Sequence, residues 1–321
     1  STNYMDGESE QVVGSVLQQL IRAGEVAREE IIVVSKIGYV QGQNLAQAKT
    51  REKSGKPYPD MVKYGDDIWH CIHPEFLTDQ LTLSLDRLGL ATLDVCLLHN
   101  PEYFLSHATR LGAGEQRELS TLRDEFYARL QLAFEYCERQ VEAGRLRGYG
   151  VSSNTSTASP DEPGATSLSR MIEAAKAAAK NVGAAAHHFT VLQCPMNVHE
   201  SGAALIKNTG PDNGSTLLDE ALREGVAVLV NRPLNAMPAQ RGGVVRLADV
   251  PVPAPEADFE TQRQKVALLE EEYRKDLAPA VAHSGQGMLP ADFFRWADEL
   301  NRIRTQVQGL EHWEQIETQM I

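Results

Sequence analysis

The sequence has 321 residues, of which 42% are hydrophobic and 23% are charged, and 31 Lys and Arg residues against 44 Asp and Glu residues give a formal net charge of −13. This length and composition exclude a chain that is disordered throughout, and they suffice for one large domain or two ordinary ones. The acidity argues against a nucleic-acid duplex or an anionic membrane as the main partner. No apolar stretch approaches the ~20 residues of a membrane span, no secretory signal is visible, and the four cysteines are widely spaced, so we expect a cytoplasmic protein with reduced thiols.

Helix-like and strand-like segments alternate from residue 10 to about residue 235. The apolar spacing predicts helices over Gln11–Arg22, Glu75–Leu88, Glu115–Ala143, Leu168–Asn181 and Ser215–Arg223. Short apolar runs predict strands over Glu29–Lys36, Leu93–His99, Leu146–Ser152, Phe189–Gln193 and Val226–Asn231. Strands that are continuously apolar and separated by helices indicate a parallel sheet covered by helices, which is the α/β class.

The pattern changes after Leu234. Residues 238–255 are rich in Pro, Gly and Val and predict a loop, and the segments that follow have helical spacing. We therefore expect residues 1–236 to form one α/β unit and residues 237–321 to form a loop and a helical extension.

Each predicted strand ends in distinctive polar residues. These strand-end residues are Lys36, His99, Ser152 with Ser153 and Asn154, Gln193, and Asn231 with Arg232. Because ligand sites of parallel α/β folds lie at the carboxyl ends of the strands, we expect these side chains to share one edge of the sheet. Taken singly, each residue also has an ordinary explanation, such as a solvated cap or a satisfied core histidine. Their recurrence at five strands favours a site.

Several segments, in this order and spacing, resemble the aldo-keto reductase family. The segments are YMDGESE (4–10), VSK (34–36), SLDRLG (84–89), LDVCLLHNP (93–101), GRLRGYGVS (144–152), Gln193 with Asn197, and RPL (232–234). The resemblance covers roughly residues 1–236. It implies a (β/α)8 TIM barrel that binds NADP or NAD and transfers a hydride between the nicotinamide and a small-molecule carbonyl or alcohol.

The same resemblance implies roles for individual residues. Tyr4, Lys36 and His99 match the catalytic Tyr, Lys and His of the family, and the catalytic Asp of the family would fall five residues before Tyr4. In this chemistry the Tyr gives a proton to the substrate oxygen, the Lys stabilises the phenolate, and the His orients the carbonyl. We expect Tyr4 to lie near Lys36 and His99.

The resemblance also implies which residues of this sequence contact the cofactor. Ser152, Ser153, Asn154 and Gln193 match positions that bind the nicotinamide carboxamide. Asn231 and Arg232 stand where many members have a stacking aromatic residue followed by Ser, and this position matches a pyrophosphate contact. The exchange removes the stacking ring, although an Arg near a pyrophosphate is reasonable.

The resemblance accounts for strands three to seven of the family barrel, and residues 237–321 contain no match for the eighth. We therefore expect an incomplete barrel of about five parallel strands, a piece of a longer polypeptide, that is inactive or weak as this chain. The alternative is a non-catalytic homologue that binds a nucleotide or a partner, favoured by the lost aromatic residue and opposed by Tyr4, Lys36 and His99. We predict no metal site, because His70 with His73 has no Cys or carboxylate that completes a ligand set, and His187 with His188 resembles a solvated loop.

Overall fold

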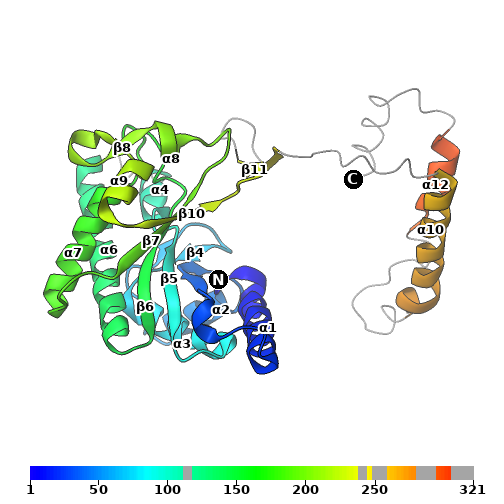
Figure 1. Cartoon of the computed structure of the whole chain (residues 1–321), viewed down its shortest axis with the longest axis horizontal. Helices are drawn as coiled ribbons and strands as arrows, with labels where there is room; N and C mark the ends of the chain where they lie inside the picture. The colour runs from blue at the N-terminus through cyan, green and yellow to red at the C-terminus, as the bar shows by residue number, and fades with distance from the viewer. Residues whose placement is uncertain (111–117, 238–243, 248–258, 280–293, 305–321) are drawn as a thin grey trace. The chain divides into compact units, whose positions relative to one another are not determined.

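The computed structural model describes residues 1–110, 118–237, 244–247, 259–279 and 294–304 (Figure 1). The chain divides into two compact units, Ser1–Ala248 and Asp249–Ile321, which we describe separately. The boundary expected after residue 236 stays a prediction. It falls next to a pair of short strands of the first unit, in which β11 (Asn235–Ala236) pairs with β12 (Val245–Arg246). Only β12 lies inside the segment expected to be a loop.

A five-stranded parallel sheet forms the centre of the first unit. Its strands are β1 (Val34–Ile37), β5 (Leu93–His99), β6 (Leu146–Ser152), β7 (Phe189–Pro195) and β10 (Ala227–Asn231), and they lie in chain order. The predicted α/β class with about five parallel strands is confirmed, and β5 and β6 have the predicted bounds. Among the described residues no further strand closes this sheet into a barrel.

One predicted strand begins later than expected. The run from Glu29 becomes regular strand only at Val34, because Arg28–Glu30 form a 3-10 helix in which the Ala27 backbone N–H donates to Glu30 Oε2 at 2.8 Å. The short turn brings the chain from the first helix to the start of β1.

Helices connect the strands as the parallel pairing requires. They are α1 (Glu8–Ala23), α2 (Gly42–Lys53), α3 (Pro74–Leu88), α4 (Tyr103–Arg110), α6 (Leu119–Glu142), α7 (Leu168–Val182), α8 (Gly202–Leu205) and α9 (Leu217–Glu224). Pro74 occupies the first turn of α3, and α7 ends at Gly183, whose φ of 78° is a left-handed conformation that suits glycine. In Figure 1, α6 and α7 lie side by side along the sheet.

Short strands and turns complete the first unit. These are β2 (Tyr39–Val40), β3 (Val62–Lys63), β4 (Trp69–His70), β8 (Lys207–Thr209) and β9 (Ser215–Thr216), with 3-10 turns at Tyr4–Gly7 and Pro211–Asn213. The helix predicted from Ser215 begins at Leu217, because Ser215 and Thr216 pair with β8. Thr216 then caps the helix, since its Oγ1 accepts from the Asp219 N–H at 3.2 Å.

The two faces of the sheet pack differently. Cys96, Leu98 and Tyr149 belong to the large apolar core, which they share with residues of α3, α6 and α7. Val95 and Leu97, which alternate with them along β5, form a small separate cluster with Val191. Strands buried on both faces explain why the sequence shows continuous apolar runs rather than alternation.

The second unit contains α10 (Phe259–Glu272), a π-helical turn (Tyr273–Leu277) and α12 (Trp296–Ile303). The chain is helical over these ranges, in agreement with the helical spacing of the sequence, and the last part of the expected extension, residues 305–321, lies outside the described residues. No helix in the described part of the chain is both long and apolar enough to cross a membrane.

Candidate active site

A cavity of about 560 Å³ lies at the carboxyl ends of the parallel strands. Eight of the nine residues singled out from the sequence line it: Tyr4, Lys36, His99, Ser152, Asn154, Gln193, Asn231 and Arg232. The roles of these residues stay predictions, but the structure brings them to one place. A volume of this size falls in the range of small-molecule and cofactor sites.

Ser153 does not line this cavity. Its side chain is fully buried, and its Oγ accepts from the N–H groups of Thr155 at 3.2 Å and Ser156 at 3.1 Å. Side chains alternate along an extended strand, so the residue after Ser152 points to the other face. Ser153 therefore shapes the turn after β6, and it is not placed to contact a ligand in the cavity.

Lys36 is the central donor of the site. Its Nζ donates to Tyr4 Oη at 3.1 Å and to Gln193 Oε1 at 3.1 Å, and Ser152 Oγ donates to the same Gln193 oxygen at 3.0 Å. The Thr2 N–H donates to the Lys36 carbonyl at 3.1 Å, which holds the segment carrying Tyr4 beside β1. Within the described ranges no carboxylate forms an ion pair with Lys36, so its charge is held by a phenol and an amide.

His99, the last residue of β5, lies edge-to-face against Tyr39 and Tyr4, with ring centroids 4.5 and 5.7 Å away. The side chain is 5% exposed. Burial, and to a smaller degree the charge of Lys36, lowers the pKa of His99 to about 2. The imidazole is therefore neutral near pH 7, and it has one ring N–H to donate and one ring nitrogen to accept.

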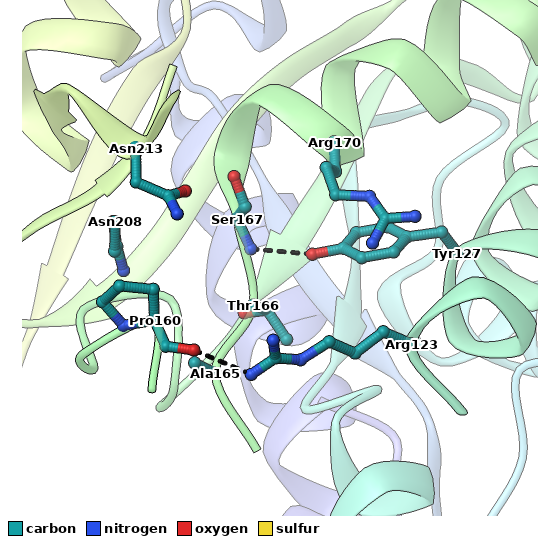
Figure 2. Close-up of a pocket in the computed structure, with 9 residues that line it drawn as sticks. All are labelled: Arg123, Tyr127, Pro160, Ala165, Thr166, Ser167, Arg170, Asn208 and Asn213. Atoms are coloured by element: carbon teal, nitrogen blue, oxygen red, sulfur yellow. Dashed lines mark hydrogen bonds between the residues drawn. The ribbon is translucent and has the colours of Figure 1, made fainter. Parts of the chain in front are cut away.

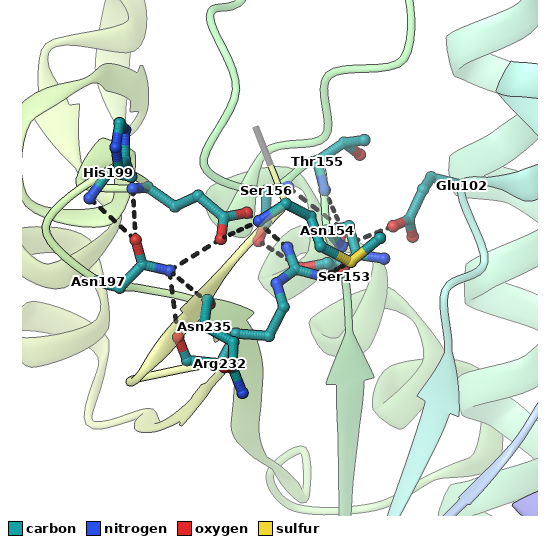
Figure 3. Close-up of polar contacts among 11 residues, drawn as sticks. Glu102, Ser153, Asn154, Thr155, Ser156, Asn197, His199, Arg232 and Asn235 are labelled. Carbon is teal, nitrogen blue, oxygen red and sulfur yellow. Dashed lines mark hydrogen bonds and ion pairs between the residues drawn. The ribbon is translucent and has the colours of Figure 1, made fainter. Parts of the chain in front are cut away.

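The guanidinium of Arg232, drawn in Figure 3 together with Asn197, forms an ion pair with Glu200. Its Nη2 lies 2.6 Å from Glu200 Oε1, and Asn197 Nδ2 donates to Glu200 Oε2 at 2.8 Å and to the Arg232 carbonyl at 3.1 Å. Burial acts to raise the pKa of Glu200, but the hydrogen bonds from Arg232 and Asn197 outweigh it and hold the pKa below its usual value. A phosphate that approaches Arg232 has to compete with this carboxylate.

Some residues of the cavity were not identified from the sequence. They include Tyr39, Ile68, Tyr103 and Met237. Asn100, which follows His99 at the end of its strand, also lines the cavity, although the sequence assigned it no role. Tyr39 lies three residues after Lys36, so proximity to a strand end was a usable signal for it. Ile68 and Tyr103 come from a loop and from α4, where no pattern marked them.

A second, smaller cavity of about 210 Å³ lies beside the start of α7 (Figure 2). It has two arginines, but both are engaged. Arg123 Nη2 donates to the carbonyls of Pro160 at 2.9 Å and Glu162 at 2.8 Å, and Arg170 Nη2 donates to Asp124 at 2.8 Å. The Arg123 contacts tie the loop before α7 to α6, and the Arg170 contact ties α7 itself to α6. Across the described residues, no three His, Cys, Asp or Glu side chains gather into a possible metal site.

Three comparisons bear on the family of the chain. The Aldo/keto reductase family model matches residues 1–162. No curated protein matches the sequence. Solved structures similar to the chain include an aldo-keto reductase AKR11C1 from Bacillus halodurans in its holo form, at 16% identity and a TM-score of 0.39, covering 71% of this chain and 49% of that one.

Two further structures contain NADP. An aldo/keto reductase from Klebsiella pneumoniae in complex with NADP and acetate is 18% identical, with a TM-score of 0.37, and covers 73% of this chain and 51% of that one. The Bombyx mori aldo-keto reductase AKR2E4 in complex with NADP is 17% identical, with a TM-score of 0.37 and coverage of 85% and 59%. The chain spans about half the length of the first two structures.

The family match covers just over half of the 321 residues and includes β1, β5 and β6, which carry Lys36, His99 and Ser152 to the cavity. By this match the chain belongs to the aldo/keto reductase family.

Proposed function

We propose that this chain carries the catalytic residues of an NAD(P)H-dependent oxidoreductase that interconverts a small-molecule carbonyl and its alcohol. The observation that carries the proposal is the hydrogen bond of 3.1 Å from Lys36 Nζ to Tyr4 Oη in a cavity that also contains a neutral His99. A nicotinamide bound there supplies the hydride.

The side chains of the cavity fit the carboxamide of a nicotinamide. Asn231 Oδ1 is buried without a hydrogen-bond partner, and the Gln193 amide nitrogen has none among the described residues. Together they offer one free acceptor and one free donor, the complement of a primary amide. Ser152 and Asn154 line the same cavity and add polar groups for orientation.

Tyr4 is the proposed proton donor. When a carbonyl carbon gains a hydride, its oxygen becomes an alkoxide that must gain a proton, and the hydroxyl of Tyr4, a cavity residue that is 45% exposed, lies within hydrogen-bond distance of the Lys36 ammonium. The Lys36 ammonium, 3.1 Å away, stabilises the negative charge that the phenol oxygen carries after it gives up its proton.

His99 is proposed to orient the substrate. A neutral imidazole donates one hydrogen bond without adding a charge that would repel the nearby Lys36 ammonium. Since the low pKa keeps the ring neutral, the orienting bond persists over the whole physiological pH range.

We propose that the chain by itself turns over slowly, as expected from the sequence. Lys36 is held by neutral partners in the described residues, and Arg232 is already paired with Glu200. The strands β1 and β10 are the two edges of the sheet, which leaves the site supported by five strands. Binding of a nucleotide or a partner without turnover is the alternative.

The test is Tyr4→Phe, measured as NADPH-dependent reduction of a panel of aldehydes and ketones by this chain and by any longer natural polypeptide that contains it. Loss of a proton donor should lower kcat by about a hundredfold or more, while the dissociation constant for NADPH stays within about threefold. Tyr58→Phe is the matched control, because the Tyr58 hydroxyl donates to Asp79 at 2.5 Å and does not line the cavity. Undiminished turnover in Tyr4→Phe would contradict the assignment, and NADPH binding without turnover in any form would favour the alternative.

A further inference from the structure

Glu102 is a buried carboxylate that the proposed chemistry does not use. It lies three residues after His99, between β5 and α4, and it is 3% exposed. Within the described ranges no Lys, Arg or His forms an ion pair with it, and its Oε2 is buried without a hydrogen-bond partner. Burial of a charge without a counter-ion costs free energy, so the contacts of Glu102 must explain why a carboxyl group occupies this position.

Glu102 contacts the turn of residues 153–156, which follows β6 (Figure 3). Its Oε1 accepts from the Asn154 backbone N–H at 2.7 Å. The next two N–H groups, of Thr155 and Ser156, donate to Ser153 Oγ. Glu102 thus comes from outside the turn and accepts the Asn154 N–H, and Asn154 is the residue of that turn that lines the cavity.

Asn154 is also connected to the other side of the cavity. Its Oδ1 lies 3.5 Å from Arg232 Nη1, at the limit of a hydrogen bond. The backbone anchor from Glu102 therefore fixes a side chain that faces both the cavity and the guanidinium held by Glu200.

We propose that Glu102 is a positioning residue of the candidate site, whose carboxylate anchors the turn of residues 153–156 and thereby sets the place of Asn154 toward a bound cofactor. The proposal rests on the proposed function for the identity of the ligand. It assigns Glu102 no contact with substrate, cofactor or reacting atoms.

The anchor depends on the charge of Glu102. Burial raises the pKa of Glu102 to about 7, although hydrogen bonds from backbone N–H groups act in the opposite direction. A hydrogen bond to an ionised carboxylate is about twice as strong as one to a neutral group. As the pH falls through about 7, the carboxyl gains a proton, the bond to Asn154 weakens, and the turn loses part of its anchor.

The titratable and charged groups around Glu102 in the described residues are on β2, α4 and the segment after β10. The turn of residues 153–156 contains none. Tyr39 on β2 interacts electrostatically with Glu102, and the pKa of that phenol is raised, chiefly by its own burial. Tyr103 follows Glu102 in α4, and Arg232 lies beyond Asn154. Since a phenol with a raised pKa stays neutral and Arg232 stays charged, neither of these two changes charge near pH 7.

The first measurement tests the hydrogen bond between the Asn154 N–H and Glu102 in the protein without cofactor. The amide proton of Asn154 is observed by NMR between about pH 5.5 and about pH 8.5 in the wild type and in Glu102→Gln. We expect its chemical shift to titrate with a midpoint near 7 in the wild type and to stay constant in the variant. A shift that does not titrate in the wild type would overturn the proposal.

The second measurement is the dissociation constant for NADPH over the same pH range, from the change in its fluorescence. In the wild type it should rise about three- to tenfold as the pH falls through 7, and in Glu102→Gln it should stay near the low-pH value. Glu138→Gln is the matched control: Glu138 is 2% exposed but contacts Tyr149 and His188, which precedes β7 at the other end of the sheet. It should follow the wild-type curve even if the protein is less stable.

The outcomes separate the two proposals. The same pH dependence in Glu102→Gln as in the wild type would overturn the positioning role while leaving the proposed function standing. Absence of NADPH binding by the wild type would overturn the proposed function, and the amide titration then decides by itself whether Glu102 anchors the turn.

Discussion

Replacement of Glu102 by Gln should change how the stability of the protein depends on pH. Burial raises the pKa of this carboxyl from 4.5 to about 7. The native state therefore keeps the proton over a pH range in which the unfolded state has lost it, and the free energy of unfolding falls as the pH rises through this range. The difference between the two pKa values corresponds to about 3 kcal/mol.

The expected result is a stability difference that grows with pH. Gln cannot ionise, so the free energy of unfolding of Glu102→Gln minus that of the wild type should increase by about 3 kcal/mol between about pH 4.5 and about pH 8. A constant offset is expected as well, since the new amide N–H groups replace an oxygen that has no partner, and an unmade buried hydrogen bond costs about 1–3 kcal/mol. The trend with pH is independent of that offset.

Urea unfolding followed by circular dichroism at several pH values measures the difference directly, because the pH dependence of all other groups cancels between the two proteins. A difference that is independent of pH, or that changes only near pH 4.5, would refute the reasoning, because Glu102 would then have the pKa of a solvated carboxyl.

Three further substitutions test other parts of the account. Lys36→Met should lower kcat by about a hundredfold while leaving NADPH affinity within about threefold, as measured by turnover and fluorescence titration, because in the proposed function the ammonium acts on Tyr4 rather than on the nucleotide. Glu200→Gln should tighten NADPH binding about three- to tenfold in the same titration, because Arg232 loses its competing anion; unchanged or weaker binding would count against a phosphate contact there. Gly150→Ala should destabilise the protein by about 1–3 kcal/mol or more in urea unfolding, because the added Cβ would lie 1.7 Å from the Val191 carbonyl oxygen of the neighbouring strand, and wild-type stability would contradict this close approach.

The strands could be predicted because their pattern is local. Leu93–His99 is buried at every position, and a continuous apolar run with a polar end is what the sequence displays. The convergence of Lys36, His99 and Gln193 could be expected for the same reason, since parallel strands in one sheet end at one edge. The helix α2 could not be predicted from the sequence. Only Asn44, Leu45 and Ala48 of its twelve residues are buried, and so small a buried face gives almost no periodic pattern of apolar residues.

The rest of the site depends on contacts between residues far apart in the sequence. The sequence does not tell whether Arg232 faces a phosphate or a carboxylate, because its charge is the same in both cases. Its partner in the structure, Glu200, lies 32 residues earlier in a loop after β7 that contains no recognisable motif. The burial of Ser153 rather than Asn154 depends on how the chain turns after β6. Charged residues are usually exposed, so the sequence alone predicts an exposed Glu102, whereas the structure buries it.

The most direct test of the proposed function is transfer of the label from NADPH deuterated at the transferring position of its nicotinamide to a carbonyl substrate, with the alcohol product analysed by mass spectrometry. We predict one deuterium per product molecule formed with the wild type and with Tyr58→Phe, and a loss of product of about a hundredfold or more with Tyr4→Phe. Product formation without deuterium, or equal labelled product from Tyr4→Phe, would contradict the claim that this cavity performs hydride transfer with Tyr4 as its proton donor.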